Sequence, residues 1–291
     1  MDNWLLFLAN QTYVHPLLDG LMIGASTLGL ALLPGLGAVL LASPTRRHTG
    51  KAMLLAAGLA LLAALLFQFL AQRPRPEGMR LLLAAPGFGS FPSGHAAVAF
   101  GAAVALALSV RRWQVGVPAI TLAALVAYSR LYLGHHYPTD VVAGALLGAS
   151  LGAAGYGLAE QPRRDWRWLL WPQIGVAAIV SMMAYLGLLP FNLLSWPLAD
   201  KVLHFLLFGA IVFWLNLWWH DRAVIVGGRA LPLAIVVPLS LALAEEGLQH
   251  FSPIRSMDVT DLLSDLAGMV FFWWLSLRVI RAQNQRAGIR S

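Results

Sequence analysis

Long apolar stretches alternate with short polar connections along almost the whole chain. A helix needs about 20 apolar residues to cross a bilayer. We predict nine membrane spans, at 17–43, 52–72, 92–110, 114–131, 139–158, 168–189, 202–219, 230–249 and 260–279. Residues 3–10 are apolar but too few to span, which predicts a segment at the membrane interface. The pattern is typical of an all-α, polytopic membrane protein.

Composition supports this interpretation and narrows the functional classes. Of the 291 residues, 59% are hydrophobic and 11% are charged, whereas soluble domains carry about 25% charged residues. The absence of cysteine excludes disulfides, a thiol nucleophile and thiolate metal ligands. The net charge of +7 does not indicate a nucleic-acid partner, because no basic run exceeds two residues and the basic residues fall between apolar stretches.

The distribution of arginine and lysine predicts the orientation in the bilayer. Connections 44–51, 111–113, 159–167 and 220–229, together with the tail from 278, hold 14 of the 20 basic residues. Basic residues concentrate on the cytoplasmic side of membrane proteins. We therefore expect a bacterial cytoplasmic membrane protein with its N-terminus outside and its C-terminus in the cytoplasm. The other six basic residues lie in or beside polar motifs on the opposite face.

The most polar stretch between spans, AEQPRRDW at 159–166, predicts a boundary between two units. Residues 1–160 would form a five-helix unit, and residues 166–280 a four-helix unit. The two halves share no recognisable internal repeat.

Polar residues of the first unit suit phosphate binding. Ser93 in the stretch FPSGH is a good helix N-cap, and Gly94 allows close backbone approach to a ligand. Free N–H groups at a helix N-terminus bind phosphate. Arg75 and Arg130, at predicted ends of spans, could hold phosphate oxygens with their guanidinium groups.

Histidines near the same face suggest transfer of a phosphoryl group. His136 and Asp140 are four residues apart at the start of the fifth span, so the carboxylate could orient the imidazole. His95 follows Gly94 directly. All three polar stretches fall at the outer ends of spans. His135 is interpreted as incidental, because the spacing to Asp140 favours its neighbour.

These motifs resemble the type-2 phosphatidic acid phosphatase superfamily, whose pattern is K-x6-RP, PSGH and SR-x5-H-x3-D. Here the matching residues are Arg75-Pro76, Pro92 to His95, and Ser129-Arg130 followed by His136 and Asp140. The resemblance implies that His136 attacks phosphorus and forms a phosphohistidine, that His95 protonates the leaving oxygen and that Asp140 orients His136. It also implies that Arg75 and Arg130 hold the phosphate, without a metal or cofactor.

The sequence departs from this pattern at one position. Gln68 stands where the family has lysine, so one cation of the phosphate clamp is missing. We expect Gln68 to donate hydrogen bonds at this position, and Arg73 or Arg80 could replace the missing charge.

The resemblance predicts a phosphatase acting on a membrane lipid phosphate or pyrophosphate at the outer face. Undecaprenyl pyrophosphate, phosphatidic acid and phosphatidylglycerol phosphate are the candidate substrates. A lipid phosphotransferase is one alternative, and a non-catalytic lipid-binding transporter or resistance factor is another. The sequence specifies neither the particular lipid nor an oligomeric state.

The second unit carries another ionisable cluster and resembles the VanZ-like family over about 166–280. The candidate residues of this second site are His204, Glu246, Arg255, Asp258, Asp261 and Asp265. Ionisable residues at membrane depth need partners or a function. We expect this cluster to bind a lipid headgroup rather than a divalent cation, which is the second candidate ligand. Alternatively, Lys201 and Arg255 pair with the acids and hold the helices together.

Overall fold

The computed structural model describes residues 2–12, 14–160, 166–190, 198–249 and 259–288. Within these ranges seven helices are long and apolar enough to cross a membrane, and two shorter apolar helices cover Gly94–Val110 and Leu233–Ala244. The all-α membrane fold class is confirmed, while the count of nine spans stays a prediction. The chain divides into two compact units, Met1–Leu189 and Pro190–Ser291.

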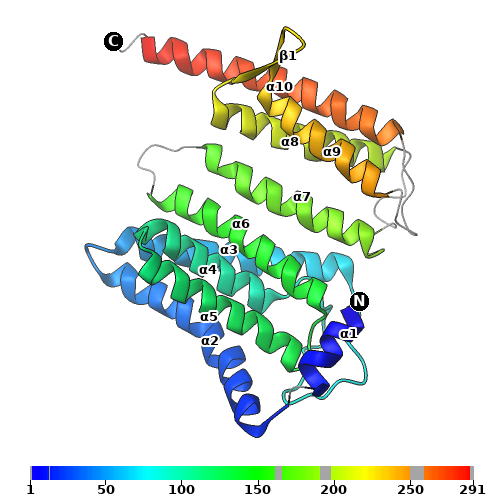
Figure 1. Ribbon diagram of the computed structural model, residues 1–291. Helices are drawn as coiled ribbons and strands as arrows, with labels where there is room; N and C mark the ends of the chain where they lie inside the picture. Colours follow the sequence, from blue (N-terminus) through cyan, green and yellow to red (C-terminus); the bar gives the residue numbers. More distant parts are fainter. Residues whose placement is uncertain (1, 13, 161–165, 191–197, 250–258, 289–291) are drawn as a thin grey trace. The chain divides into compact units, whose positions relative to one another are not determined.

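The first unit contains a bundle of long helices (Figure 1). Its helices are α2 (Pro16–Ala42), α3 (Arg47–Ala71), α4 (Gly94–Val110), α5 (Trp113–Tyr132), α6 (Pro138–Glu160) and α7 (Leu170–Tyr185), the last preceded by a 3₁₀ turn at Trp166–Leu169. Helix α4 packs against α2, α3, α5 and α6. Most of its residues are buried, with alanine dominating.

Glycines on α6 allow this helix to approach α4 closely. A Cβ added at Gly144 would lie 2.3 Å from the carbonyl oxygen of Ser93, and one at Gly148 would lie 2.2 Å from that of Ala97. Small residues four apart are a common contact surface between membrane helices. The glycine positions therefore bring the N-terminal ends of α4 and α6 together, and this is where the polar motifs lie.

The predicted interfacial segment is a short helix, α1 (Asp2–Phe7), followed by one π-helical turn at Leu8–Thr12. Trp4 is 63% exposed, as a membrane-interface aromatic would be. The buried Asn10 side chain donates to the carbonyl oxygens of Arg80 and Tyr132, at 2.9 and 2.7 Å. The segment is therefore fixed to the end of the bundle that carries the polar motifs (Figure 1).

Helix α7 belongs to the first compact unit. Ile179 and Met183 are buried in one apolar cluster with Ala143 and Leu147 of α6. The compact units thus divide after Leu189, one helix later than the polar stretch at 159–166 indicated. The polar stretch connects α6 and α7, which pack side by side, and a division of the chain at 159–166 stays a prediction.

The second compact unit holds α8 (Ala199–Trp219), α9 (Leu233–Gln249) and α10 (Val259–Gly288), and with α7 these are the four helices that we predicted for residues 166–280. Helices α8 and α10 approach closely, because a Cβ at Gly268 would lie 2.2 Å from the carbonyl oxygen of Phe205. A hairpin of β1 (Ala223–Val226) and β2 (Arg229–Pro232) precedes α9.

The hairpin corrects the predicted span 230–249, whose first residues are a strand. Gly227 and Gly228 form its turn with φ of +57° and +79°. Two consecutive residues of positive φ suit a tight hairpin turn, which glycine adopts without strain. The Gly-Gly pair beside β-branched residues was the sequence signal for this element.

Candidate active site

The three motifs of the first unit converge at one end of the bundle. The segment between α3 and α4 carries Arg75, the start of α4 carries His95, and the α5–α6 connection carries His136 (Figure 1). Arg130, Arg75, His135 and His136 all lie close enough to His95 to act on its charge. The structure therefore brings the predicted catalytic and phosphate-binding residues into one cluster.

The N-terminus of α4 is fixed against α6. Ser93 caps the helix, its hydroxyl accepting from the N–H of Ala96 at 3.5 Å. The Ser93 N–H itself donates to the carbonyl oxygen of Asp140 at 2.9 Å. The N–H groups of Gly94 and His95 follow in the first turn, where helices have no internal acceptors. This end of α4 is thus suited to receive an anion.

His136 is oriented mainly by a main-chain carbonyl. Its Nδ1 lies 2.8 Å from the carbonyl oxygen of Ser90 and 3.6 Å from Oδ2 of Asp140. Since a carbonyl only accepts, Nδ1 carries the proton and Nε2 keeps its lone pair, which faces Nη1 of Arg75 at 3.4 Å. Complete burial lowers the pKa of His136, which favours the neutral ring at pH 7.

Asp140 has stronger partners than His136. Its Oδ1 accepts from Arg73 at 2.6 Å, and its Oδ2 accepts from the N–H of Tyr137 at 2.9 Å. Arg73 also contacts Asp2 at 3.2 Å. The carboxylate therefore fixes the turn that carries His136 and supplies negative charge near the ring, in addition to its longer contact with Nδ1.

Neither arginine suggested as a replacement for the missing lysine is free to act as one. Arg73 is paired with Asp140 and Asp2. Arg80 forms a bidentate pair with Asp19, at 2.8 and 2.9 Å. Both charges are already balanced by carboxylates, which does not favour either arginine as the replacement.

Arg75 and Arg130 are held differently, by neutral acceptors. Arg75 donates to the carbonyl oxygens of Pro86, Phe88 and His135 at 3.0, 3.1 and 2.8 Å, and its Nη1 lies 3.4 Å from Nε2 of His136. Burial lowers the pKa of Arg75. Arg130 contacts the Ser26 hydroxyl and the His135 ring. Among the described residues no carboxylate forms a salt bridge with either arginine, so both keep their charge for a ligand.

Gln68 lies beside this cluster but its donor is already used. The side chain is 5% exposed, and its Nε2 donates to the carbonyl oxygen of Pro92 at 2.8 Å. Its Oε1 is buried and has no partner among the described residues. The amide therefore supports the turn before Ser93 and presents an acceptor where a lysine would present a cation.

His135, interpreted as incidental from the sequence, is part of the cluster. It is 2% exposed and contacts Arg130 through its ring. The sequence does not predict the contact between the His135 ring and Arg130, because that contact depends on the conformation of the turn after α5.

Several residues of the second predicted cluster also lie close together in the structure. Lys201 on α8 contacts Asp261 on α10, and Nδ1 of His204 lies 2.9 Å from Oδ1 of Asp265. Asp261 and Asp265 are buried. The side chains of Glu246, Arg255 and Asp258 lie outside the described residues. In the part that the structure describes, no three acidic, histidine or cysteine side chains are arranged to hold a metal.

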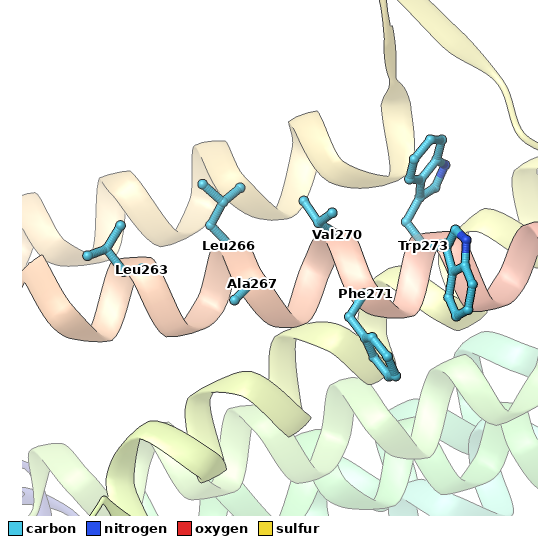
Figure 2. A pocket seen from close by; sticks show the side chains of 7 residues that line it. Leu263, Leu266, Ala267, Val270, Phe271 and Trp273 are labelled. Carbon is cyan, nitrogen blue, oxygen red and sulfur yellow. The ribbon is translucent and has the colours of Figure 1, made fainter.

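A separate hollow runs along α10 (Figure 2). Leu263, Leu266, Ala267, Val270, Phe271, Trp273 and Trp274 line it. Apart from the indole N–H groups these side chains are apolar, so the hollow has the character of a lipid-facing helix surface and contributes no chemistry.

Two family comparisons cover most of the chain. Residues 49–164 match the PAP2 superfamily, and residues 158–281 match the VanZ/LLP1 family. The second match begins where the polar stretch begins, before α7.

Individual relatives agree with the first match. The chain is 35% identical over 133 residues to the decaprenylphosphoryl-5-phosphoribose phosphatase of Mycobacterium tuberculosis, covering 45% of this chain and 71% of that protein. It is 48% identical over 60 residues to an undecaprenyl-diphosphatase of Sulfolobus acidocaldarius, covering 21% of this chain but only 29% of the relative.

A solved PAP2-type phosphatidylglycerolphosphate phosphatase from Bacillus subtilis is 30% identical, with a TM-score of 0.49, covering 56% of this chain and 87% of that one. The motif residues, their convergence, the family match at 49–164 and the relative from Mycobacterium tuberculosis lead to one assignment. The chain belongs to the PAP2 superfamily, with a VanZ/LLP1 region following the PAP2 region.

Proposed function

We propose that this protein is a phosphatase that removes phosphate from a membrane lipid phosphate or pyrophosphate through a phosphohistidine. The observation that carries the proposal is the pair of arginines, Arg75 and Arg130, which lack a carboxylate partner among the described residues and flank the histidine cluster. Arginines buried without a counter-ion favour binding of an anion. The unprotonated Nε2 of His136 lies at this cationic site, 3.4 Å from Nη1 of Arg75.

In the first step, Nε2 of His136 attacks phosphorus while the bond to the leaving oxygen breaks. The leaving oxygen takes a proton from His95, whose protonated form is favoured by the negative charge of bound phosphate. Nδ1–H stays on the Ser90 carbonyl, and Asp140 nearby stabilises the positive charge that develops on the ring.

In the second step, water attacks the phosphohistidine and gives a proton to His95. The N–P bond breaks, inorganic phosphate forms and both histidines return to their starting states. Arg75 and Arg130, with the N-terminus of α4, stabilise the phosphoryl oxygens in both steps. Replacement of water by a lipid hydroxyl would make the same site a phosphotransferase.

The substrate class follows from the surroundings of the site. A polytopic membrane protein offers its site to an amphipathic molecule, and two relatives are named for polyprenyl-linked phosphates. We therefore propose undecaprenyl pyrophosphate first, with phosphatidic acid and phosphatidylglycerol phosphate as further candidates. The bias of basic residues supports a site on the extracytoplasmic face of the cytoplasmic membrane.

The test is phosphate release from a panel of these lipids by purified protein, with trapping of the labelled enzyme. We expect labelled phosphate to appear on the wild type in an acid-labile, base-stable bond. His136→Ala should lose turnover by more than about a thousandfold and lose the label, yet keep phosphate affinity, because the arginines remain. A labelled His136→Ala would exclude this nucleophile.

A metal-independent reaction predicts full activity in excess EDTA and inhibition by vanadate. Loss of activity on chelation that a divalent ion restores would contradict it. Binding of lipid phosphate by the wild type without release of phosphate would instead indicate a non-catalytic binding protein.

A further inference from the structure

His135 engages both phosphate-binding arginines at once. Its Nδ1 contacts Nη2 of Arg130, and its main-chain carbonyl accepts from Nη1 of Arg75 at 2.8 Å. Its Nε2 lies 2.9 Å from the carbonyl oxygen of Leu83. Its main-chain N–H donates to the carbonyl oxygen of Arg130. The polar atoms of this buried residue therefore contact the two arginines and the Leu83 carbonyl oxygen.

The partners fix the tautomer of the ring. A guanidinium only donates, so Nδ1 must accept, and a carbonyl only accepts, so Nε2 must carry the proton. His135 is thus a neutral imidazole with the proton on Nε2, the opposite tautomer to His136. Burial lowers the pKa of His135 to about 4, which keeps the ring neutral at pH 7.

The neutrality of this acceptor matters for Arg130. Arg130 also contacts the hydroxyl of Ser26, which is uncharged as well. The Nε of Arg130 has no partner among the described residues. A carboxylate in place of the ring would orient the guanidinium equally well but would cancel its charge, as Asp19 does for Arg80. A neutral acceptor orients Arg130 and leaves the charge available.

We propose that His135 is a positioning residue that holds both phosphate-binding arginines without neutralising them, through its ring for Arg130 and its carbonyl for Arg75. This proposal rests on the proposed function. It adds His135 to that function as a residue that does not itself attack, protonate or bind the substrate.

The test compares His135→Asn with His135→Asp, which have the same shape and differ in charge. Both place an oxygen near the position of Nδ1, so both can accept from Arg130. We expect His135→Asp to bind inorganic phosphate at least tenfold more weakly than His135→Asn at pH 7.5. Without phosphate, His135→Asp should melt at the higher temperature in detergent, because it gains an ion pair with Arg130.

Opposite effects on stability and on phosphate affinity distinguish positioning from a merely structural role. Equal phosphate affinity of the two variants would overturn the proposal. His135→Phe, which removes the acceptor and keeps the carbonyl to Arg75, should also weaken phosphate binding about tenfold relative to His135→Asn. If His135→Phe does not fold, the Asn and Asp pair still decides.

Phosphate binding separates this proposal from the proposed function. Should the wild type bind phosphate but hydrolyse no lipid phosphate, the enzymatic proposal fails while the comparison of the variants stands. Should the wild type hydrolyse lipid phosphates and the two variants share one kcat/KM and one phosphate affinity, only the role of His135 fails.

Discussion

At the residue scale, the charge of the proposed phosphate site is determined by which arginines are paired with carboxylates. Arg73 and Arg80 are balanced by Asp140 and Asp19, whereas Arg75 and Arg130 contact neutral acceptors. Gln68 adds no charge and uses its N–H₂ group on Pro92. The site is thus built on two cations where the family pattern supplies three.

Gln68→Lys tests whether the missing cation limits phosphate binding. We expect KM for a lipid phosphate to fall about tenfold, since one charge-assisted hydrogen bond contributes ~1.5–3 kcal/mol. The neighbouring Pro92 carbonyl can accept from the ammonium as it does from the amide. The measurement is steady-state kinetics beside Gln68→Met, which matches the length of the side chain without adding charge. Equal KM values for Lys and Met would place this side chain outside the phosphate site.

At the element scale, glycines on α6 and α10 determine how closely the helices pack and therefore which polar residues meet. Gly144 and Gly148 allow α6 to reach α4, so the Asp140 carbonyl accepts from Ser93. Gly268 does the same for α8 and α10, where Lys201 reaches Asp261.

Gly148→Ala should separate α4 from α6 and displace His95 from His136. The added Cβ would lie 2.2 Å from the Ala97 carbonyl oxygen, and such overpacking costs about 1–3 kcal/mol. We expect a lower melting temperature in detergent and a clear loss of kcat/KM. Gly58→Ala on α3 is the matched control, because its Cβ meets nothing within 4 Å. A Gly148→Ala protein as stable and active as the control would refute close packing at this position.

The Lys201–Asp261 pair tests whether the second cluster is structural. Asp261→Asn removes a buried carboxylate that contacts the Lys201 ammonium, while the exposed Asp200 stays 3.0 Å from the same ammonium. We expect a loss of about 3 kcal/mol in unfolding free energy if the pair is structural. Lys201→Met together with Asp261→Asn should recover part of it. A stable single variant that handles full-length lipid substrates poorly would instead favour a headgroup pocket.

At the scale of the whole molecule, the distribution of basic residues predicts one orientation in the membrane. His48 and Ile225 lie in two stretches rich in arginine, 44–51 and 220–229, and Gly87 lies in the segment between α3 and α4. The proposed orientation places the first two in the cytoplasm and the third outside.

Single cysteines test this orientation without background, because the chain has none of its own. In intact cells an impermeant thiol reagent should label Gly87→Cys and leave His48→Cys and Ile225→Cys unlabelled until the membrane is permeabilised. All three positions are exposed. Labelling of His48→Cys but not Gly87→Cys in intact cells would place the site in the cytoplasm.

Sequence patterns were enough to predict the membrane class and the approximate helices of the first unit. They were also enough to select His95, Arg75, Arg130 and His136 as candidate site residues. This was possible because bilayer length constrains apolar stretches and because the motif spacing is local. The hairpin of β1 and β2 was not predicted, although the pair Gly227-Gly228 is typical of a hairpin turn.

Which arginines keep an unbalanced charge depends on the three-dimensional fold. The sequence presents Arg73, Arg75, Arg80 and Arg130 as equivalent cations. Helix packing determines their partners, because Asp19, Asp140 and Ser26 lie 61 to 104 positions along the chain from the arginines that they contact. The same holds for His135, whose ring is directed at Arg130 by the fold of one turn. Local sequence patterns specify residue types. The balance of charge in a buried site depends instead on contacts between segments that are far apart in the sequence.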